Sequence, residues 1–185
     1  MPNRKKATIG ILMAVLICLC VISNVCLLVQ SSVKVMPKIG TVLNLLALSS
    51  ASIYCISGYR KNAHVYYKGF LSFYAIHILT GAYGMVVDFK GSPMAAAWVL
   101  AFVITYANVM MLFIPDDLGE KKSKAIAALN AVIWLGFLIH HFIFKSNTIG
   151  FYTIRIASYL LSAILTAVLV YAKYEDKKER KPSNT

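Results

Sequence analysis

Residues 67–88 form an apolar stretch that carries an unusual amount of polar chemistry along one helical face. At steps of three and four residues that face presents Tyr74, His77, Gly81, Gly84 and Asp88. His77 lies about 15 Å from the start of the stretch, which is close to the midplane of a bilayer. Ionisable side chains at that depth are costly and usually functional. We therefore predict that His77 is a ligand-binding or proton-binding residue.

Two other interpretations of His77 stay open at this stage. Its ring can hydrogen-bond a neighbouring helix, as polar side chains inside membrane spans commonly do. It can also ligate haem iron, which imidazole suits. A second haem ligand would have to lie at equal depth, but His140 is displaced from His77 by about 8 Å along the membrane normal. His64 falls in an expected cytoplasmic loop. We therefore expect no cofactor.

A second set of polar residues falls within about two helical turns of the expected outer membrane boundary. The set contains Asn24, Asn44, Asp88, His140, His141 and Arg155. Arg155 also begins a stripe at helical spacing that continues with Ser158, Ser162 and Thr166. Together these side chains could line a polar vestibule for an anionic or polar ligand. The predicted ligand-binding residues are His77, Arg155, Asp88, Asn44, His140 and Ser158.

The same residues also have structural explanations. An arginine near a helix end can extend its charged head to the membrane interface, and the histidines there can lie among lipid headgroups. Asp88 can simply pair with Arg155 or Lys90. The sequence alone leaves both interpretations open.

Four further residues are expected to pack helices. Asn108 and Asn130 lie at similar depth on consecutive spans and could hydrogen-bond across the interface. Gly10 and Ala14 form a small-residue stripe on the first span, suited to close helix contact.

Motifs of enzymes are absent from the sequence. It has no HExxH, GxSxG or P-loop, and the four cysteines include no CxxC pair. Asp88 is the one carboxylate expected away from the cytoplasmic face, so a two-acid hydrolase or a carboxylate-rich metal site has no residues to form it. We predict that the protein is not an enzyme and holds no metal.

The elements that position these residues follow from composition. Of the 185 residues 59% are hydrophobic and 14% are charged, whereas soluble domains average about 25% charged residues. Apolar runs alternate with short polar loops, which predicts an all-α bundle of six transmembrane helices. The expected spans cover residues 7–29, 39–58, 67–87, 94–114, 125–144 and 151–172 of a single domain, 1–174, followed by a charged tail, 175–185.

The basic residues predict how the bundle is oriented. Fourteen of the 19 lysines and arginines fall at the termini and in the second and fourth loops. The excess of positive charge marks the cytoplasmic side, so both termini are expected to be cytoplasmic. The net charge of +12 reflects this topology rather than nucleic-acid binding, since no basic groove with flanking aromatics occurs. A bacterial cytoplasmic membrane is the expected location, and a eukaryotic organelle also fits.

The six-span layout, the size and the spacing of Gly10 and Ala14 resemble the membrane substrate-binding subunits of energy-coupling-factor vitamin transporters. In that family a small-xxx-small motif on the first helix docks the transport partner, so the resemblance implies a docking role for Gly10 and Ala14. It implies no particular ligand.

These observations predict a non-enzymatic membrane protein that binds or helps translocate a small polar or anionic solute through a site open to the outside. A structural or regulatory subunit of a larger complex is the alternative, with either a homo-oligomer or a membrane partner subunit. A haem-binding redox protein is the third interpretation.

Overall fold

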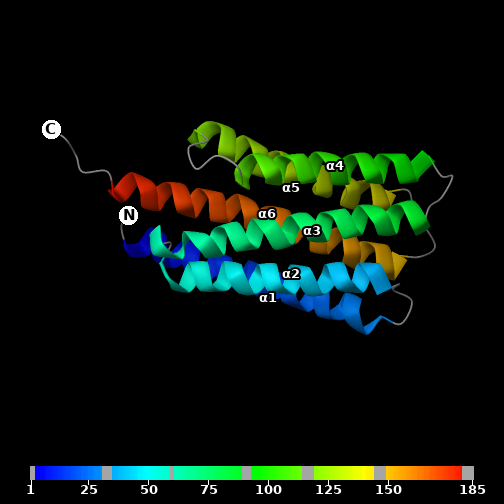
Figure 1. The fold of residues 1–185 in the computed structure, drawn as a ribbon, viewed down its shortest axis with the longest axis horizontal. Helices are drawn as coiled ribbons and strands as arrows, with labels where there is room; N and C mark the ends of the chain where they lie inside the picture. The colour runs from blue at the N-terminus through cyan, green and yellow to red at the C-terminus, as the bar shows by residue number, and fades with distance from the viewer. Residues whose placement is uncertain are drawn as a thin grey trace.

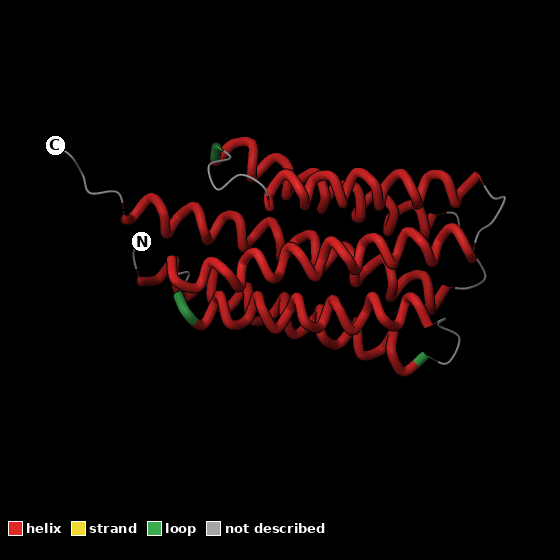
Figure 2. The backbone as a smooth tube through the Cα atoms, in the orientation of Figure 1, coloured by secondary structure: helices red, strands yellow, loops and turns green. Residues whose placement is uncertain are grey.

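The computed structural model is all-helical and describes residues 3–30, 35–58, 61–88, 93–113, 119–143 and 149–180. Six long helices follow one another: α1 (Asn3–Val29), α2 (Val35–Ile56), α3 (His64–Asp88), α4 (Pro93–Phe113), α5 (Glu120–Ile143) and α6 (Ile149–Arg180), with a short 3-10 turn, η1 (Lys61–Ala63), before α3. Figure 2 shows helix along nearly all of the described chain. All six helices are long and apolar enough to cross a membrane, which confirms the expected all-helical, six-span architecture.

Two helix ends illustrate how the sequence sets the boundaries. Helix α2 ends where Gly58 takes a φ of 66°, the left-handed region that favours glycine, and donates its N–H to the Cys55 carbonyl at 3.0 Å. Helix α6 runs to Arg180, beyond the expected end at residue 172. The added residues are charged but are good helix formers without glycine or proline, so leaving the apolar region does not end the helix.

Each helix packs against the next one along the chain, and α6 packs back against α1. In Figure 1, α3 and α6 lie between a layer of α1 and α2 and a layer of α4 and α5. The membrane-spanning parts of α6 and α3 are accordingly 56% and 50% buried, against 22% for α5. Because α3 and α6 are the central helices, residues on their facing sides define the interior.

The outer surface of the bundle is largely apolar. Large hydrophobic side chains are exposed on all of the first five helices, such as Ile11 on α1, Val42 on α2 and Val132 on α5. Exposed apolar area on this scale is unfavourable in water but suits contact with lipid chains. The bundle therefore presents an apolar surface, while a few polar side chains such as Asn44, Asn130 and Arg155 are buried inside it.

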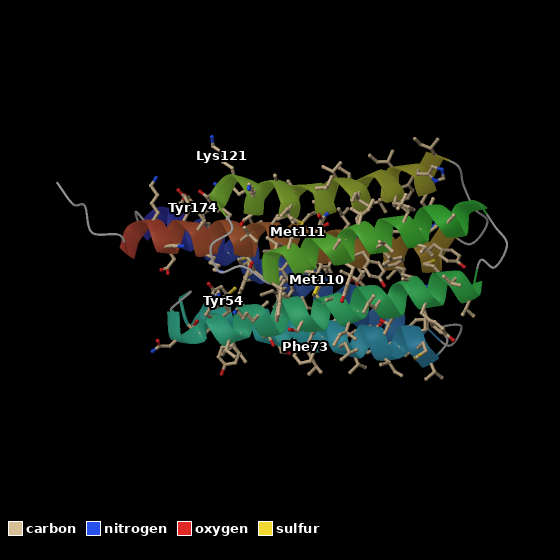
Figure 3. The ribbon with its side chains drawn as sticks, turned by 45° about the horizontal axis from the view of Figure 1, so that its top comes forward. Tyr54, Phe73, Met110, Met111, Lys121 and Tyr174 are labelled. Carbon is tan, nitrogen blue, oxygen red and sulfur yellow. The ribbon has the colours of Figure 1, made fainter. Side chains whose placement is uncertain are left out.

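The first turn of α1 and the last turns of α6 lie at the same end of the bundle (Figure 1), as six crossings require. Lys121, in the first turn of α5, also lies at this end and points outward (Figure 3). This end, which we call the terminal end, is therefore basic, and the opposite end carries the beginnings of α2 and α6.

Candidate functional site

Tyr159 of α6 lies at the centre of the bundle and is 2% exposed. One nearly parallel ring neighbour is His77 of α3, at 4.7 Å between centroids, and the other is Trp134 of α5, at 4.6 Å. Phe102 of α4 meets Tyr159 edge-on at 4.9 Å. Offset-stacked and edge-to-face pairs at these distances are favourable. Tyr159 of α6 is therefore in direct ring contact with α3, α4 and α5.

His77 lies near the middle of α3, as predicted, and is 3% exposed. Its ring points to α6, where it covers one face of Tyr159. Neither ring nitrogen makes a hydrogen bond with a described side chain, and the polar neighbour within reach of the ring is the backbone of Gly40 on α2. Buried polar atoms are nearly always hydrogen-bonded, so the position of this ring requires an explanation. The interpretation of His77 as an interhelical hydrogen-bonding residue stays a prediction, and the backbone of Gly40 on α2 is the partner available to it.

Arg155 lies one helical turn before Tyr159 and is also 3% exposed. Its guanidinium crosses to α3, where its Nη2 would lie 2.7 Å from a β-carbon placed on Gly84. It is also within hydrogen-bonding reach of the Tyr159 hydroxyl. Arg155 therefore turns inward, rather than extending along the helix surface to the membrane interface.

Glycines on α2 and α3 create the space for these contacts. A β-carbon at Gly81 would overlap the Tyr159 hydroxyl, and one at Gly40 would overlap the Thr80 hydroxyl. Gly84 likewise makes room for Arg155. The glycine face predicted on residues 67–88 thus accepts polar side chains that cross from α6.

A small cavity lies among these residues, at the end of the bundle opposite the terminal end. Its lining comes from α1, α2, α3 and α6: Leu27, Pro37, Thr41, His77, Thr80, Gly81, Arg155 and Tyr159. Its volume is about 10 Å³, roughly what one water molecule needs. The cavity brings together the two residues, His77 and Arg155, on which the sequence analysis placed most emphasis.

A network of amides lies beside this cavity and links α1, α2 and α6. The Asn44 side-chain amide donates to Asn24 Oδ1 at 3.2 Å and to Ser162 Oγ at 3.3 Å, and Asn24 donates to the Cys20 carbonyl at 2.7 Å. Asn44 lies one turn along α2 from Thr41, which lines the cavity. Ser158 is buried nearby on α6, and its hydroxyl has no hydrogen-bond partner within the described part of the chain. Asn44 and Ser158 therefore surround the site without lining the cavity.

No described contact places the other two predicted ligand-binding residues, His140 and Asp88, at the cavity. His140 is exposed on α5, so the structure does not bring it to Arg155 as the vestibule interpretation expected. His141 is half-buried, and the side chain of Asp88 lies outside the described residues. Whether His140 and Asp88 contact a ligand stays a prediction.

The helix-packing predictions have different outcomes. Asn108 of α4 donates to Asn130 Oδ1 of α5 at 2.9 Å with both residues buried, so the predicted link is confirmed. Gly10 and Ala14 are exposed on α1, and nothing lies within 4 Å of a β-carbon placed on Gly10. Among the described residues, no helix packs closely on this pair, and their predicted role in helix packing stays a prediction.

Sequence reasoning missed Tyr159, Thr41, Thr80 and Gly40. Tyr159 follows Arg155 by four residues, so it lies on the same helical face, and this spacing was the available signal. A tyrosine within an apolar span is common enough that nothing in its type distinguished it. Thr41, Thr80 and Gly40 become significant only once α2 and α3 are known to be neighbours.

The residues present do not fit haem or a bound metal. The cavity is far smaller than a porphyrin, and the ring that stacks on His77 belongs to a tyrosine. Among the described residues, no three His, Cys, Asp or Glu side chains come together as a metal site would need.

Comparisons with known protein families, curated proteins and solved structures find no match for this chain.

Proposed function

We propose that this chain is a multi-pass membrane protein that binds, or helps translocate, a small polar or anionic solute at the cavity between His77 and Arg155. The observation that carries the proposal is a buried histidine ring, with neither nitrogen hydrogen-bonded to a described side chain, facing the same cavity as a buried guanidinium. Holding two such groups inside a membrane bundle is costly. A solute that accepts or donates hydrogen bonds there offsets that cost.

The surroundings of the cavity support binding from one side. Leu27, Pro37 and Arg155 lie close to the helix ends opposite the terminal end. Toward the terminal end the interior is filled by large side chains, including Phe70, Leu71 and Leu165, each 0% exposed. The interior is thus polar near the cavity and closely packed toward the terminal end. This arrangement favours a solute-binding site over an open channel through the bundle. In the proposed orientation the termini are cytoplasmic and the cavity faces the outside of a cell membrane.

The test is ligand-dependent thermal stabilisation of the purified protein. A panel of small anions and neutral polar solutes would be screened at constant ionic strength. Any hit would be repeated on Arg155→Ala and His77→Ala, with Tyr83→Phe, a change at a tyrosine of α3 that is 55% exposed, as the control. We expect stabilisation in the wild type and in the control but not in the two site variants. Equal stabilisation of all four proteins would refute the proposal.

The alternative function is that of a structural or regulatory subunit. The observation that favours it is the exposure of Gly10 and Ala14 on α1, because a small-residue stripe lets a second helix approach closely. This alternative predicts that a partner, or a second copy, co-purifies and that Gly10→Leu releases it. A wild-type protein that purifies alone as a monomer would argue against it.

A further inference from the structure

The cavity restricts the size of its ligand. At about 10 Å³ it accommodates one water-sized occupant. Its walls are closely packed. The side chain of Thr80 occupies the space where a β-carbon on Gly40 would lie, and that of Tyr159 occupies the same space at Gly81. A carboxylate, phosphate or sulfate would have to displace these packed groups further than a single halide ion would, although chloride and bromide are themselves somewhat larger than water.

The charge of the walls restricts the ligand further. The guanidinium of Arg155 stays protonated in proteins and lies on the wall of the cavity. Inside a bundle the effective dielectric constant is low, so this charge repels a cationic solute and attracts an anionic one strongly. Ammonium and metal cations are therefore disfavoured occupants.

The hydrogen-bond donors are concentrated on the wall formed by α3 and α6. The Arg155 guanidinium, the Tyr159 hydroxyl and one nitrogen of a neutral His77 ring can each donate. Thr41 and Thr80 direct their hydroxyl protons to the backbone oxygens of Pro37 and His77, at 2.9 and 2.8 Å. Both hydroxyls are free to rotate, and helix carbonyls already accept from the backbone, so these protons can turn toward a ligand. Leu27 and Pro37 contribute an apolar wall.

We infer that the preferred solute is a monatomic anion of the halide class, held by Arg155, Tyr159 and His77; this inference rests on the proposed function and narrows it. A halide accepts hydrogen bonds from any direction and has no proton that needs an acceptor. A monatomic halide is also smaller than carboxylate, phosphate and sulfate, so it requires the least expansion of a cavity sized for one water molecule.

The experiment uses the purified full chain in a gluconate buffer of constant ionic strength. Sodium chloride and sodium bromide are titrated against sodium acetate and sodium sulfate while the unfolding temperature is recorded. We expect a saturable rise with chloride and bromide, of roughly 5 °C at a hundredfold excess over Kd, and no rise with acetate or sulfate. Broadening of the chloride NMR line by the protein, reversed by excess bromide, measures binding directly.

Variants separate a specific site from a general salt effect. Tyr159→Phe keeps the ring stack and removes one donor, so it should weaken chloride affinity by roughly tenfold, the loss of about one hydrogen bond. Arg155→Gln should abolish saturable binding, while Tyr83→Phe, a matched change at an exposed tyrosine of α3, should bind as the wild type does. If Arg155→Gln does not fold, Tyr159→Phe carries the test. Chloride stabilisation that is unchanged in Tyr159→Phe would overturn the inference.

The outcomes distinguish this inference from the proposed function. Stabilisation by acetate or sulfate that depends on Arg155, without any by halides, would overturn the halide inference and leave the proposed function standing. If no anion and no neutral polar solute stabilised the protein, both would fall.

Discussion

The contact between Gly81 and Tyr159 gives the sharpest test of the packing described above. In Gly81→Ala the new methyl group would overlap the Tyr159 hydroxyl and lie 2.7 Å from Phe102 Cε1 and 2.9 Å from Tyr159 Cζ. Tyr159 cannot swing aside easily, because the rings of His77 and Trp134 stack against it. Overpacking of this kind costs about 1–3 kcal/mol.

Alanine is also a better helix former than glycine, by up to about 1 kcal/mol. The change in the free energy of unfolding caused by Gly81→Ala would therefore combine a destabilising steric overlap with a stabilising gain in helix propensity. Gly136→Ala on α5 removes this ambiguity, since nothing lies within 4 Å of its β-carbon position. The helix-propensity gain is then common to both variants. The difference between them, about 1–3 kcal/mol in the free energy of unfolding, measures the steric term alone.

The assay is thermal unfolding of both variants in the same detergent. At a few degrees per kcal/mol for a chain of this size, Gly81→Ala should unfold roughly 3–10 °C below Gly136→Ala. Combining Gly81→Ala with Tyr159→Phe removes the overlapping hydroxyl, so the double variant should recover part of the loss as a favourable coupling energy. Equal unfolding temperatures for the two alanine variants, or no recovery in the double variant, would refute the proposed packing of Tyr159 against α3.

Three further predictions test the rest of the bundle. Asn108→Leu and Asn130→Leu should each lower stability but show a coupling energy of about 0.6–2 kcal/mol in a double-mutant cycle, because they remove one shared hydrogen bond; strictly additive losses would contradict that bond. Asn44→Leu should destabilise by about 1–3 kcal/mol, since it leaves Asn24 Oδ1 buried without its donor, and an unfolding temperature equal to the wild type would argue against the amide network. Reporter fusions that are active only in the cytoplasm should be active at both termini, whereas activity at one terminus alone would contradict the six-span topology.

The fold could be predicted largely from hydropathy, because six apolar runs of sufficient length leave few alternatives in a bilayer. The depth of a residue along its helix could also be predicted. The pairing of Asn108 with Asn130 and the central position of His77 are examples. Both depend only on distance along the chain, which a helix fixes at about 1.5 Å per residue.

The direction in which a side chain points could not be predicted as well, and His140 shows the reason. The buried face of α5 carries Ala127, Asn130 and Trp134, and continues by helical spacing to His141. His140, one residue earlier, is rotated by about 100° and is exposed. In water an amphipathic pattern would have marked the inner face, but a helix in lipid is apolar on nearly every side, so the sequence did not distinguish the two histidines.

The glycine face of α3 was visible in the sequence, but what occupies it was not. Gly81 and Gly84 indicated only that something could approach closely. The groups that do so, from Tyr159 and Arg155, come from a helix about 75 residues further along the chain. No local pattern encodes such a contact, because it depends on α6 lying opposite α3 in the folded bundle.

The stack of His77, Tyr159 and Trp134 makes the cavity optically observable. Tyr159 forms a wall of the cavity and is in contact with Trp134, so a ligand that shifts the tyrosine also changes the surroundings of the indole. Close-packed rings cannot move independently. Trp98, the one other tryptophan in the sequence, lies 6.2 Å from Trp134 and belongs to the same aromatic group. The intrinsic fluorescence of the protein should therefore report on the cavity from inside the bundle, without an added label.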